Sequence, residues 1–307
     1  MKLTYSVVIP TKDRSELLRG ALTGIAAQTR RPERIVVVDA SDPPVALGGE
    51  LPDAARAAGV ELLVIHAPAS TAGQRNRGIE RVETPITLLL DDDVSLEPEY
   101  VETLLGRWER DGEEAFGAIV GVPGQMPRQG PLARVMRRLF MLHYQAQRGE
   151  ATSFRRSRKL RMVLNPSHAV VVPACGAGYG LFRTDLLRRH PFDERFPGYA
   201  PGEDLDMSSR LAADAPILAV PSVRYLHAWD PRERKAPGRW HRRGRCETYF
   251  RLRHLDSSPV SRAAFGLSLV AETAVAAAES LRERDRRHVA GFVRGVAEAL
   301  REHRRGS

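Results

Sequence analysis

The first 95 residues alternate short apolar runs with segments of helical periodicity, and this alternation constrains the fold more than any other feature. Apolar runs without polar alternation are typical of strands that are buried on both faces of a sheet. They occupy residues 6–10, 34–39, 61–66 and 86–90. One helix is expected after Ser15, which is a good N-cap, and another within residues 71–82. This order predicts parallel βαβ units and a doubly wound, mostly parallel α/β sheet with flanking helices.

Acidic residues follow three of the four predicted strands. Asp13 lies just past the first strand, Asp39 ends the second, and Asp91, Asp92 and Asp93 follow the fourth. Ligands of such sheets bind beyond the carboxyl ends of the strands, so we expect these carboxylates to gather at one edge. Their charge there requires a cation or the donor groups of a ligand. The Asp run alone fits a solvated acidic turn equally well, and the other strand-end acids favour a Mg²⁺ or Mn²⁺ site.

The second half of the chain is less regular. A basic amphipathic helix is expected at residues 131–147, and the acids of residues 202–211 suit the first turn of a further helix. The remaining expected elements are a strand at 169–173, a helix at 184–189, and short strands at 217–220 and 223–227. After Asp230 the chain becomes Arg-rich and then Ala-rich, which predicts a helical C-terminal extension.

The net charge of +9 is unevenly distributed. Residues 128–161 contain ten Lys or Arg residues and a single acid, Glu150. Such a region attracts diphosphates, anionic lipids or nucleic acid. No nucleic-acid-binding motif is present, and an acidic strand-end cluster fits that function poorly, so nucleic acid is not an expected partner. The 131–147 helix is expected either to rest on an anionic membrane surface or to pack on the protein with its arginines in water.

The N-terminus and the cysteine content favour the cytoplasm, with peripheral association at the inner face of the cell membrane left open. The chain begins with a strand-like segment rather than a secretory signal, and it has only two cysteines, Cys175 and Cys246. Residues 263–278 are apolar, but Glu272 interrupts them and they are short for a membrane span.

Several short motifs, taken in order, resemble the inverting glycosyltransferases of family 2. They lie at residues 6–14, 34–39, 73–78, 91–93, 178–183 and 202–206. The resemblance covers Ser6 to about Leu211. It implies a GT-A-type fold, with a Rossmann-like nucleotide-binding half joined to an acceptor-binding half. The expected domain is residues 1–230, divided into halves 1–95 and 96–230, followed by a basic loop and C-terminal helices at 231–307.

The resemblance also implies a donor site for a nucleotide-diphosphate sugar. Pro10, Thr11 and Asp13 would line the nucleoside pocket, and Asp39 would accept a hydrogen bond from the base or ribose. Arg75 would lie near the diphosphate, although ion pairing on a helix surface is the alternative for this residue. Asp92 would contact the ribose or the sugar. UDP is the first choice of nucleotide, with dTDP and GDP as alternatives.

The metal and the chemistry follow from the same resemblance. Asp91 and Asp93 form a DxD motif for Mg²⁺ or Mn²⁺, and His227 is a candidate third ligand. Asp204 would be the general base that takes the proton of an acceptor hydroxyl, with Glu203 orienting the donor or acceptor. Stabilising acids at a helix N-terminus are the alternative for this Glu-Asp pair.

The function expected is metal-dependent, inverting transfer of a sugar to a hydroxyl of a glycan, a lipid-linked molecule or a small molecule. One alternative is a binding module without turnover. A nucleotidyltransferase is disfavoured because the first strand lacks a Gly-rich loop after it. Trp229 and Trp240 are candidates for stacking on a sugar ring, with core or interface packing as the alternative. Arg242, Arg243 and Arg245 are candidates for a mobile loop over the diphosphate, and a solvated basic face is the alternative.

Overall fold

The computed structural model divides the chain into two compact units. Unit 1 comprises residues 1–125, 165–199 and 204–229, and unit 2 comprises residues 126–164, 200–203 and 230–307. The residues described are 2–45, 59–112, 114–124, 130–142, 144–145, 152–162, 166–196, 198, 200–228 and 238–306.

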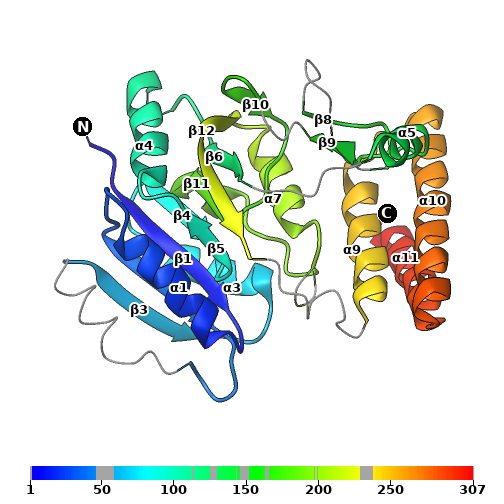
Figure 1. Ribbon diagram of the computed structural model, residues 1–307, viewed down its shortest axis with the longest axis horizontal. Coiled ribbons are helices and arrows are strands. Elements are labelled where there is room, and N and C mark those ends of the chain that lie inside the picture. Colours follow the sequence, from blue (N-terminus) through cyan, green and yellow to red (C-terminus); the bar gives the residue numbers. More distant parts are fainter. Residues whose placement is uncertain are drawn as a thin grey trace. The chain divides into compact units, whose positions relative to one another are not determined.

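Unit 1 is built on a nine-stranded sheet with the order β10-β12-β6-β11-β4-β1-β2-β3, to which β5 is added beside β12 (Figure 1). The strands are β1 Tyr5–Thr11, β2 Arg34–Asp39, β3 Glu61–His66, β4 Ile86–Leu90, β5 Val94–Leu96, β6 Ala118–Pro123, β10 Val170–Val172, β11 Tyr179–Arg183 and β12 Ile217–His227. Strands β4, β1, β2 and β3 pair in parallel, as the sequence predicts. Strand β11 enters antiparallel between β4 and β6. The α/β fold class is therefore confirmed, and the sheet is mixed beyond β4.

Helices cover both faces of this sheet. They are α1 Ser15–Ala26, α3 Thr71–Glu80, α4 Tyr100–Asp111, α6 Thr184–Arg189 and, apart from its first residue, α7 Glu203–Leu211. Ser15 is the first helical residue and Arg14 is the N-cap, one position earlier than predicted. The strands 217–220 and 223–227 form one strand, β12, with an irregular register between Val220 and Arg224.

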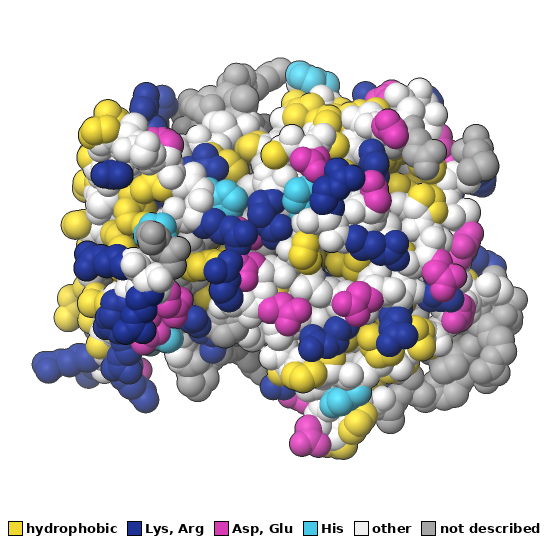
Figure 2. Space-filling model, turned by 180° about the vertical axis from the view of Figure 1, so that it is seen from behind, with side chains coloured by type: hydrophobic (Ala, Val, Ile, Leu, Met, Phe, Trp, Pro, Cys, Tyr) yellow, Lys and Arg dark blue, Asp and Glu magenta, His cyan; other side chains and the backbone are white. Residues whose placement is uncertain are grey.

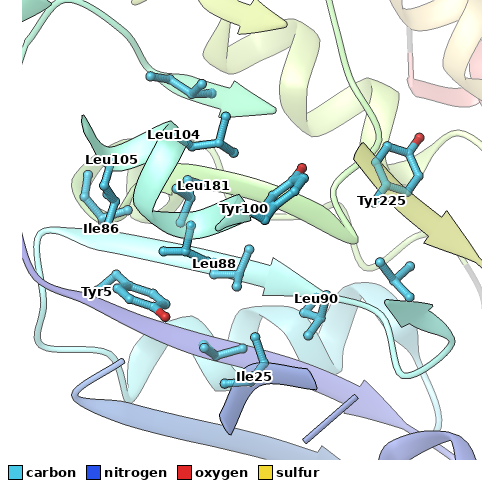
Figure 3. Close-up of a cluster of buried hydrophobic side chains, with 14 of the residues drawn as sticks. Tyr5, Ile25, Ile86, Leu88, Leu90, Tyr100, Leu104, Leu105, Leu181 and Tyr225 are labelled. Carbon is cyan, nitrogen blue, oxygen red and sulfur yellow. The ribbon is translucent and has the colours of Figure 1, made fainter. Parts of the chain in front are cut away.

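The continuous apolar runs fill two cores because successive side chains of a strand point to opposite faces. Tyr5 and Leu88 pack with Tyr100 and Leu181 on one face, in the cluster drawn in Figure 3. Val8 packs with other buried residues on the opposite face. Burial on both faces explains why these runs lack polar alternation.

Unit 2 combines helices with a small sheet of order β7-β9-β8. Its elements are α5 Pro131–Leu139, β7 Tyr144–Gln145, β8 Ser153–Phe154, β9 Leu160–Met162, α9 Arg239–His254, α10 Pro259–Glu283 and α11 Arg287–Gly306. Helices α9, α10 and α11 pack against one another (Figure 1). Unit 2 contains residues 126–164 as well as the segment from residue 230 onward. The expected division into residues 1–230 and 231–307 stays a prediction.

The prediction of one helix over 131–147 was wrong. Helix α5 ends at Leu139, Met141 has a φ of 53°, and strand β7 follows. The guanidinium of Arg155 donates hydrogen bonds to the carbonyl oxygens of Arg137 at 3.0 Å and Leu142 at 3.1 Å. These bonds satisfy carbonyl groups that a longer helix would have paired internally.

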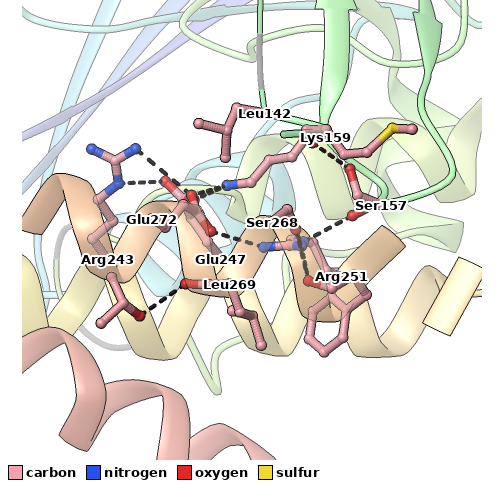
Figure 4. Close-up of polar contacts among 12 residues, drawn as sticks. Leu142, Ser157, Lys159, Arg243, Glu247, Arg251, Ser268, Leu269 and Glu272 are labelled. Atoms are coloured by element: carbon pink, nitrogen blue, oxygen red, sulfur yellow. Dashed lines mark hydrogen bonds and ion pairs between the residues drawn. The ribbon is translucent and has the colours of Figure 1, made fainter. Parts of the chain in front are cut away.

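A buried network of charges joins Lys159, the residue before β9, to α9 and α10 (Figure 4). Lys159 Nζ lies 2.5 Å from Glu272 Oε1 and also binds Glu247, and Arg251 Nη1 lies 2.9 Å from Glu272 Oε2. Burial alone would raise the pKa of Glu247, but Lys159 and Arg243 lower the pKa below its usual value. The charges are buried in compensating pairs, which is the condition for such groups to be tolerated inside a protein.

Helix α10 is longer than the apolar segment predicted from the sequence. Among the helices in the described ranges, it alone is long and apolar enough to cross a membrane, judged by length and composition. Its mid-helix residue Glu272 is buried and paired with Lys159 and Arg251. These pairs indicate a helix that packs within unit 2.

The basic loop expected after residue 230 is helical from Arg239 onward, since Arg242, Arg243 and Arg245 lie in α9. Arg243 pairs with Glu247 at 3.0 Å, and Arg245 pairs with Glu302 at 3.0 Å. The expectation that these arginines form a mobile loop was therefore wrong. Residues 231–237 lie outside the described residues.

Candidate functional site

The candidate site lies in unit 1, at the carboxyl ends of parallel strands. Thr11 ends β1, Asp39 ends β2, and Asp91 directly follows β4. The register pairs Thr11 with Asp39, which places both residues at the same edge of the sheet. The strand-end side chains therefore lie at one edge of the sheet, as predicted. Contacts from Thr11 and Arg14 connect Asp92 and Asp93 to this group.

Asp92 is held by the end of β1. Thr11 Oγ1 donates a hydrogen bond of 2.8 Å to Asp92 Oδ2, and Arg14 Nη1 lies 3.2 Å from Asp92 Oδ1. Arg14 Nη1 also lies 3.5 Å from Asp93 Oδ2. Burial raises the pKa of Asp92 to about 6, although the Thr11 hydroxyl and the Arg14 charge oppose the rise. The positive charge of Arg14 therefore partly compensates the negative charge of Asp92 and Asp93. The sequence analysis did not predict this function of Arg14.

Asp93 and His227 are neighbours. His227 Nε2 lies 2.9 Å from Asp93 Oδ1, and Ala228 donates its backbone N–H to the Asp93 carbonyl at 2.8 Å. The antiparallel pairing of β12 with β5 sets this position, because it places His227 opposite Val94. Two of the three predicted metal ligands are thus adjacent, although 134 residues separate them in the sequence (227 − 93).

Asp91, the third predicted ligand, is paired with an arginine. Arg75 projects from α3, its Nη2 lies 2.6 Å from Asp91 Oδ1, and its guanidinium carbon lies 5.2 Å from the Phe192 ring centre. Only 4% of Arg75 is exposed, so its charge is buried against Asp91 rather than displayed on the helix surface. The surface ion-pair alternative for Arg75 was therefore wrong.

Gly178 leaves the space that the Asp91 carboxylate occupies. A Cβ atom at this position would lie 2.0 Å from Asp91 Oδ2, far closer than atoms can approach. The backbone N–H of Asp91 also donates a 3.0 Å hydrogen bond to the Gly178 carbonyl, beside the pairing of Tyr179 with Leu90. The insertion of β11 beside β4 therefore positions Asp91.

Asp204, the candidate base, begins the part of α7 that belongs to unit 1. It is half-buried, and its Oδ1 accepts a 2.8 Å hydrogen bond from the N–H of Leu205. Burial raises the pKa of Asp204, and the nearby charge of Arg75 opposes the rise. The negative charge of Asp91 also raises this pKa. Asp91, Arg75 and Asp204 therefore interact electrostatically within one site.

Two stacked tyrosines lie near this base. The rings of Tyr179 and Tyr225 are 3.8 Å apart between centroids and inclined by 13°. The negative charge of Asp204 contributes to the raised pKa of both phenols, after the larger effect of burial. Tyr179 follows Gly178, so both fall in the glycine-rich motif at 178–183, whereas nothing in the sequence marks Tyr225 as its partner.

Ser41 forms hydrogen bonds with two of the predicted nucleoside-pocket residues, Asp39 and Asp13. Asp39 Oδ1 accepts hydrogen bonds from the Ser41 N–H at 2.9 Å and hydroxyl at 2.6 Å, and Oδ2 accepts one from Val45 N at 2.7 Å. Burial alone would raise the pKa of Asp39, but these hydrogen bonds lower it below its usual value. Asp13 is exposed and donates its N–H to Ser41 Oγ at 2.8 Å, and Pro10 is buried within β1. Asp39 therefore also orders the loop after β2.

The donor atoms around Asp93 are compatible with a divalent cation. Carboxylate oxygen suits Mn²⁺ and Mg²⁺, and Mg²⁺ is commonly held by one or two carboxylates together with phosphate oxygens. The neutral imidazole of a histidine is a common metal ligand in proteins. Within the described residues, no group of three or more His, Cys, Asp or Glu side chains is close enough to hold one ion. Asp93 and His227 are thus a two-ligand pair, while Asp91 points to Arg75.

The remaining predicted residues lie elsewhere. Glu203 is buried and clusters with unit 2, unlike Asp204. Trp240 is only 4% exposed and packs edge-on against Phe292, with ring centroids 6.0 Å apart, so it is a core residue and not a sugar platform. Trp229 lies outside the described residues.

The sequence model of Glycosyl transferase family 2 matches residues 6–188, and the chain belongs to this family. Its fold is the GT-A fold, and the chain is a glycosyltransferase. No curated protein matches the sequence.

Solved structures are similar in fold. Residues 1–349 of S. aureus TarS share 14% identity with a TM-score of 0.52, and the match covers 99% of this chain and 92% of that one. GalNAc-T7, crystallised with UDP, GalNAc and Mn²⁺, shares 17% identity with a TM-score of 0.54, and the match covers 73% of this chain. This chain spans 43% of GalNAc-T7 and 44% of a longer TarS chain.

Proposed function

We propose that the protein transfers a sugar from a nucleotide-diphosphate sugar to an acceptor hydroxyl with inversion, using Asp204 as the general base. The observation that carries the proposal is the arrangement around Arg75. This buried arginine pairs with Asp91 at 2.6 Å and also opposes the burial-induced rise in the pKa of Asp204. One positive charge therefore serves a carboxylate of the donor motif and the proposed base together.

In the proposed reaction, Asp204 takes the proton of the acceptor hydroxyl. The acceptor oxygen then forms a bond to the anomeric carbon while the bond from that carbon to the diphosphate oxygen breaks, and the nucleoside diphosphate leaves with the electron pair. The configuration inverts because the base and the leaving group lie on opposite faces of the sugar. The electrostatic effect of Arg75 on Asp204 supports this assignment, since a base must be ionised to accept a proton.

Pro10, Thr11, Asp13, Asp39 and Asp92 are proposed to form the nucleoside and ribose pocket. The Thr11–Asp92 and Ser41–Asp39 hydrogen bonds hold polar groups at the strand ends where such ligands bind. UDP is the proposed nucleotide, and the UDP in the GalNAc-T7 structure supports this choice. Glu203 is proposed to help orient the acceptor or the donor. Cytoplasmic localisation remains part of the proposal.

Asp91, Asp93 and His227 are proposed to hold Mg²⁺ or Mn²⁺ together with the diphosphate of the donor. The adjacency of Asp93 and His227 supports this, as does the Mn²⁺ in the GalNAc-T7 structure. When bound, the cation would neutralise charge on the departing diphosphate. Binding through Asp91 would require its carboxylate to be shared with Arg75 or released from it.

The decisive experiment is the Asp204→Asn variant, assayed against a panel of nucleotide sugars. Because general-base catalysis contributes about 10²–10⁴-fold, transfer should fall by at least roughly 100-fold while nucleotide binding persists. Asp185→Asn is the matched control, since Asp185 is an exposed acid paired with Arg183. Wild-type turnover in the Asp204 variant would refute the assignment. Donor binding without any turnover by the wild-type protein would instead favour a binding module.

The metal proposal is tested by nucleotide binding to the Asp91→Asn/Asp93→Asn double variant, measured calorimetrically with Mn²⁺ and with a chelator. We expect the wild-type protein to bind UDP more tightly with Mn²⁺ and the double variant to lose this difference. Identical binding by both proteins under both conditions would exclude these aspartates as ligands.

A further inference from the structure

Helix α5 presents its apolar side chains to solvent. Leu132, Val135, Met136 and Leu139 are 75%, 62%, 44% and 63% exposed. Their spacing of three, one and three residues places them on one face of the helix, and none of the nine residues of α5 is buried. The apolar face of an amphipathic helix in a soluble protein normally packs against the core. These four residues are called the α5 face below.

The rest of unit 2 fixes α5 with this face outward. Arg155 binds carbonyl groups at the C-terminal end of the helix, and Ser157 Oγ donates a 2.6 Å hydrogen bond to the carbonyl of Met141. The Ser157 carbonyl accepts a 2.9 Å hydrogen bond from Arg251 Nε, and Arg251 in turn binds Glu272 of α10. The backbone of α5 is therefore anchored through its C-terminal end, so the outward α5 face belongs to the folded unit.

Helix α10 of the same unit has a second exposed apolar strip. Its inward side buries Ser268 and Glu272, whereas Val260, Val270 and Leu281 are 56%, 68% and 81% exposed. In Figure 2, hydrophobic side chains and Lys or Arg side chains lie together along the left edge, which corresponds to the edge of Figure 1 that α5, α10 and α11 share. Unit 2 thus exposes apolar side chains on two helices, α5 and α10. Hydrogen bonds through Ser157 and Arg251 connect these helices.

The charges around the α5 face select an anionic partner. Between Glu114 and Glu150 the sequence contains no acidic residue, whereas α5 itself carries Arg134, Arg137 and Arg138. Apposition of two copies through α5 would bring these arginines close to one another, so self-association is electrostatically disfavoured. Of the three arginines, Arg138 is exposed, whereas Arg134 and Arg137 are half-buried. An exposed apolar stripe in a basic helix is the composition of a helix that lies in the interface of an anionic membrane.

We propose that unit 2 docks on an anionic lipid membrane through the α5 face. The four apolar side chains enter the boundary between headgroups and acyl chains, while the exposed Arg138 contacts a lipid phosphate. This inference goes beyond the proposed sugar transfer and does not depend on it, because binding to vesicles is measured without turnover.

The test is co-sedimentation of the full chain with vesicles, using phosphatidylcholine alone or a mixture with phosphatidylglycerol. We expect binding to the mixed vesicles at low salt, loss of binding at high salt, and little binding to phosphatidylcholine alone. No binding to mixed vesicles at low salt would overturn the proposal. Equal binding to both vesicle types would overturn the requirement for anionic lipid.

Substitutions locate the contact. The double variant Leu132→Gln/Leu139→Gln changes two exposed side chains and should weaken vesicle binding at least roughly tenfold without affecting the fold. Arg138→Gln should weaken binding roughly fivefold. Val171→Gln is the control for apolar exposure, because Val171 is 62% exposed on strand β10 in unit 1. Equal losses in the α5 double variant and the Val171 variant would refute a specific role for α5.

Two further measurements separate this proposal from its alternatives. Sedimentation velocity without vesicles should show a monomer, and a dimer that the Leu132→Gln/Leu139→Gln variant dissociates would assign the α5 face to a second copy instead. Hydrolysis of a soluble nucleotide sugar should be unchanged in this variant. A variant that binds vesicles normally but loses hydrolysis would refute docking through α5 and connect the helix to the donor reaction.

Discussion

At the scale of single residues, Arg75 has the most consequential position. It is buried in α3, pairs with Asp91, and counteracts the rise in the pKa of Asp204 that burial causes. A buried charge without partners is costly, and an arginine between two acids favours the ionised form of both, although the acids themselves repel each other. The same guanidinium can therefore serve both donor binding and proton transfer.

Replacing Arg75 by Gln should raise the pKa of Asp204. Burial already raises this pKa, and loss of the guanidinium removes a charge that lowers it. The base works in its ionised form, so activity present above the pKa is lost as the pH falls through it. The acid limb of the kcat/KM profile should therefore move to higher pH, with a smaller movement in Arg75→Lys. An unchanged acid limb in both variants would contradict the coupling of Arg75 to the base.

Gly178 is required by close approach to Asp91 rather than by an unusual backbone angle. In Gly178→Ala the new Cβ would collide with the Asp91 carboxylate, which must then move. We expect kcat/KM for the donor to fall by roughly 100-fold, because a displacement of about 1 Å at a site has that effect.

Gly20→Ala is the matched control, since a Cβ at Gly20 would meet nothing within 4 Å in helix α1. This variant should keep its activity and gain about 0.5–1 kcal/mol of helix stability. Thermal unfolding of both variants, followed by circular dichroism, separates a displaced site from a damaged fold. Full activity in Gly178→Ala would show that the position of Asp91 does not matter for transfer.

At the scale of helices and strands, the buried charges of unit 2 hold the segment before β9, α9 and α10 together. Lys159 directly precedes β9, Glu247 and Arg251 lie in α9, and Glu272 lies in α10. All four are largely buried. Each ion depends on the others, because removing one partner leaves an uncompensated charge in a region of low polarity. The stability of unit 2 should therefore be sensitive to any member of the network.

Glu272→Gln should lower the free energy of unfolding of unit 2 by about 3–5 kcal/mol, which is typical for breaking a buried ion pair. The control Glu283→Gln lies on the same helix, where the exposed Glu283 pairs with Arg282. Its effect should be about 0–1 kcal/mol. Urea denaturation is monitored by the fluorescence of Trp240, which is buried in unit 2, in a background where Trp108 and Trp229 are replaced by Phe. Equal stabilities of the two variants would contradict a structural role for the network.

At the scale of the whole molecule, the chain builds unit 2 from segments far apart in the sequence. Residues 126–164 belong with the helices that follow residue 230. A chain of residues 1–230 would therefore contain residues 126–164 without the C-terminal helices that belong to the same unit.

A chain truncated after residue 230 should expose the 126–164 segment to proteases. Lys159 would lose Glu247 and Glu272, and the Ser157 carbonyl would lose the donor Arg251. Trypsin should cut within this Arg-rich segment of the truncated chain well before it cuts the same segment of the full chain, as mass spectrometry of the fragments would show. Equal protection in both chains would mean that the segment folds without the C-terminal helices.

The sequence by itself determined the parallel strands of the N-terminal half, and it correctly predicted a cluster of acidic residues at their carboxyl ends. These features depend on local patterns, since apolar runs report burial and parallel strands bring their carboxyl ends to one edge. Only the tertiary structure determined which charged side chains contact each other. Arg75 faces Asp91, His227 faces Asp93, and Lys159 reaches Glu272 across 113 positions of sequence. Helical periodicity showed that α5 has an apolar face, but the outward direction of that face depends on Arg155 and Ser157, whose contacts arise only in the folded chain.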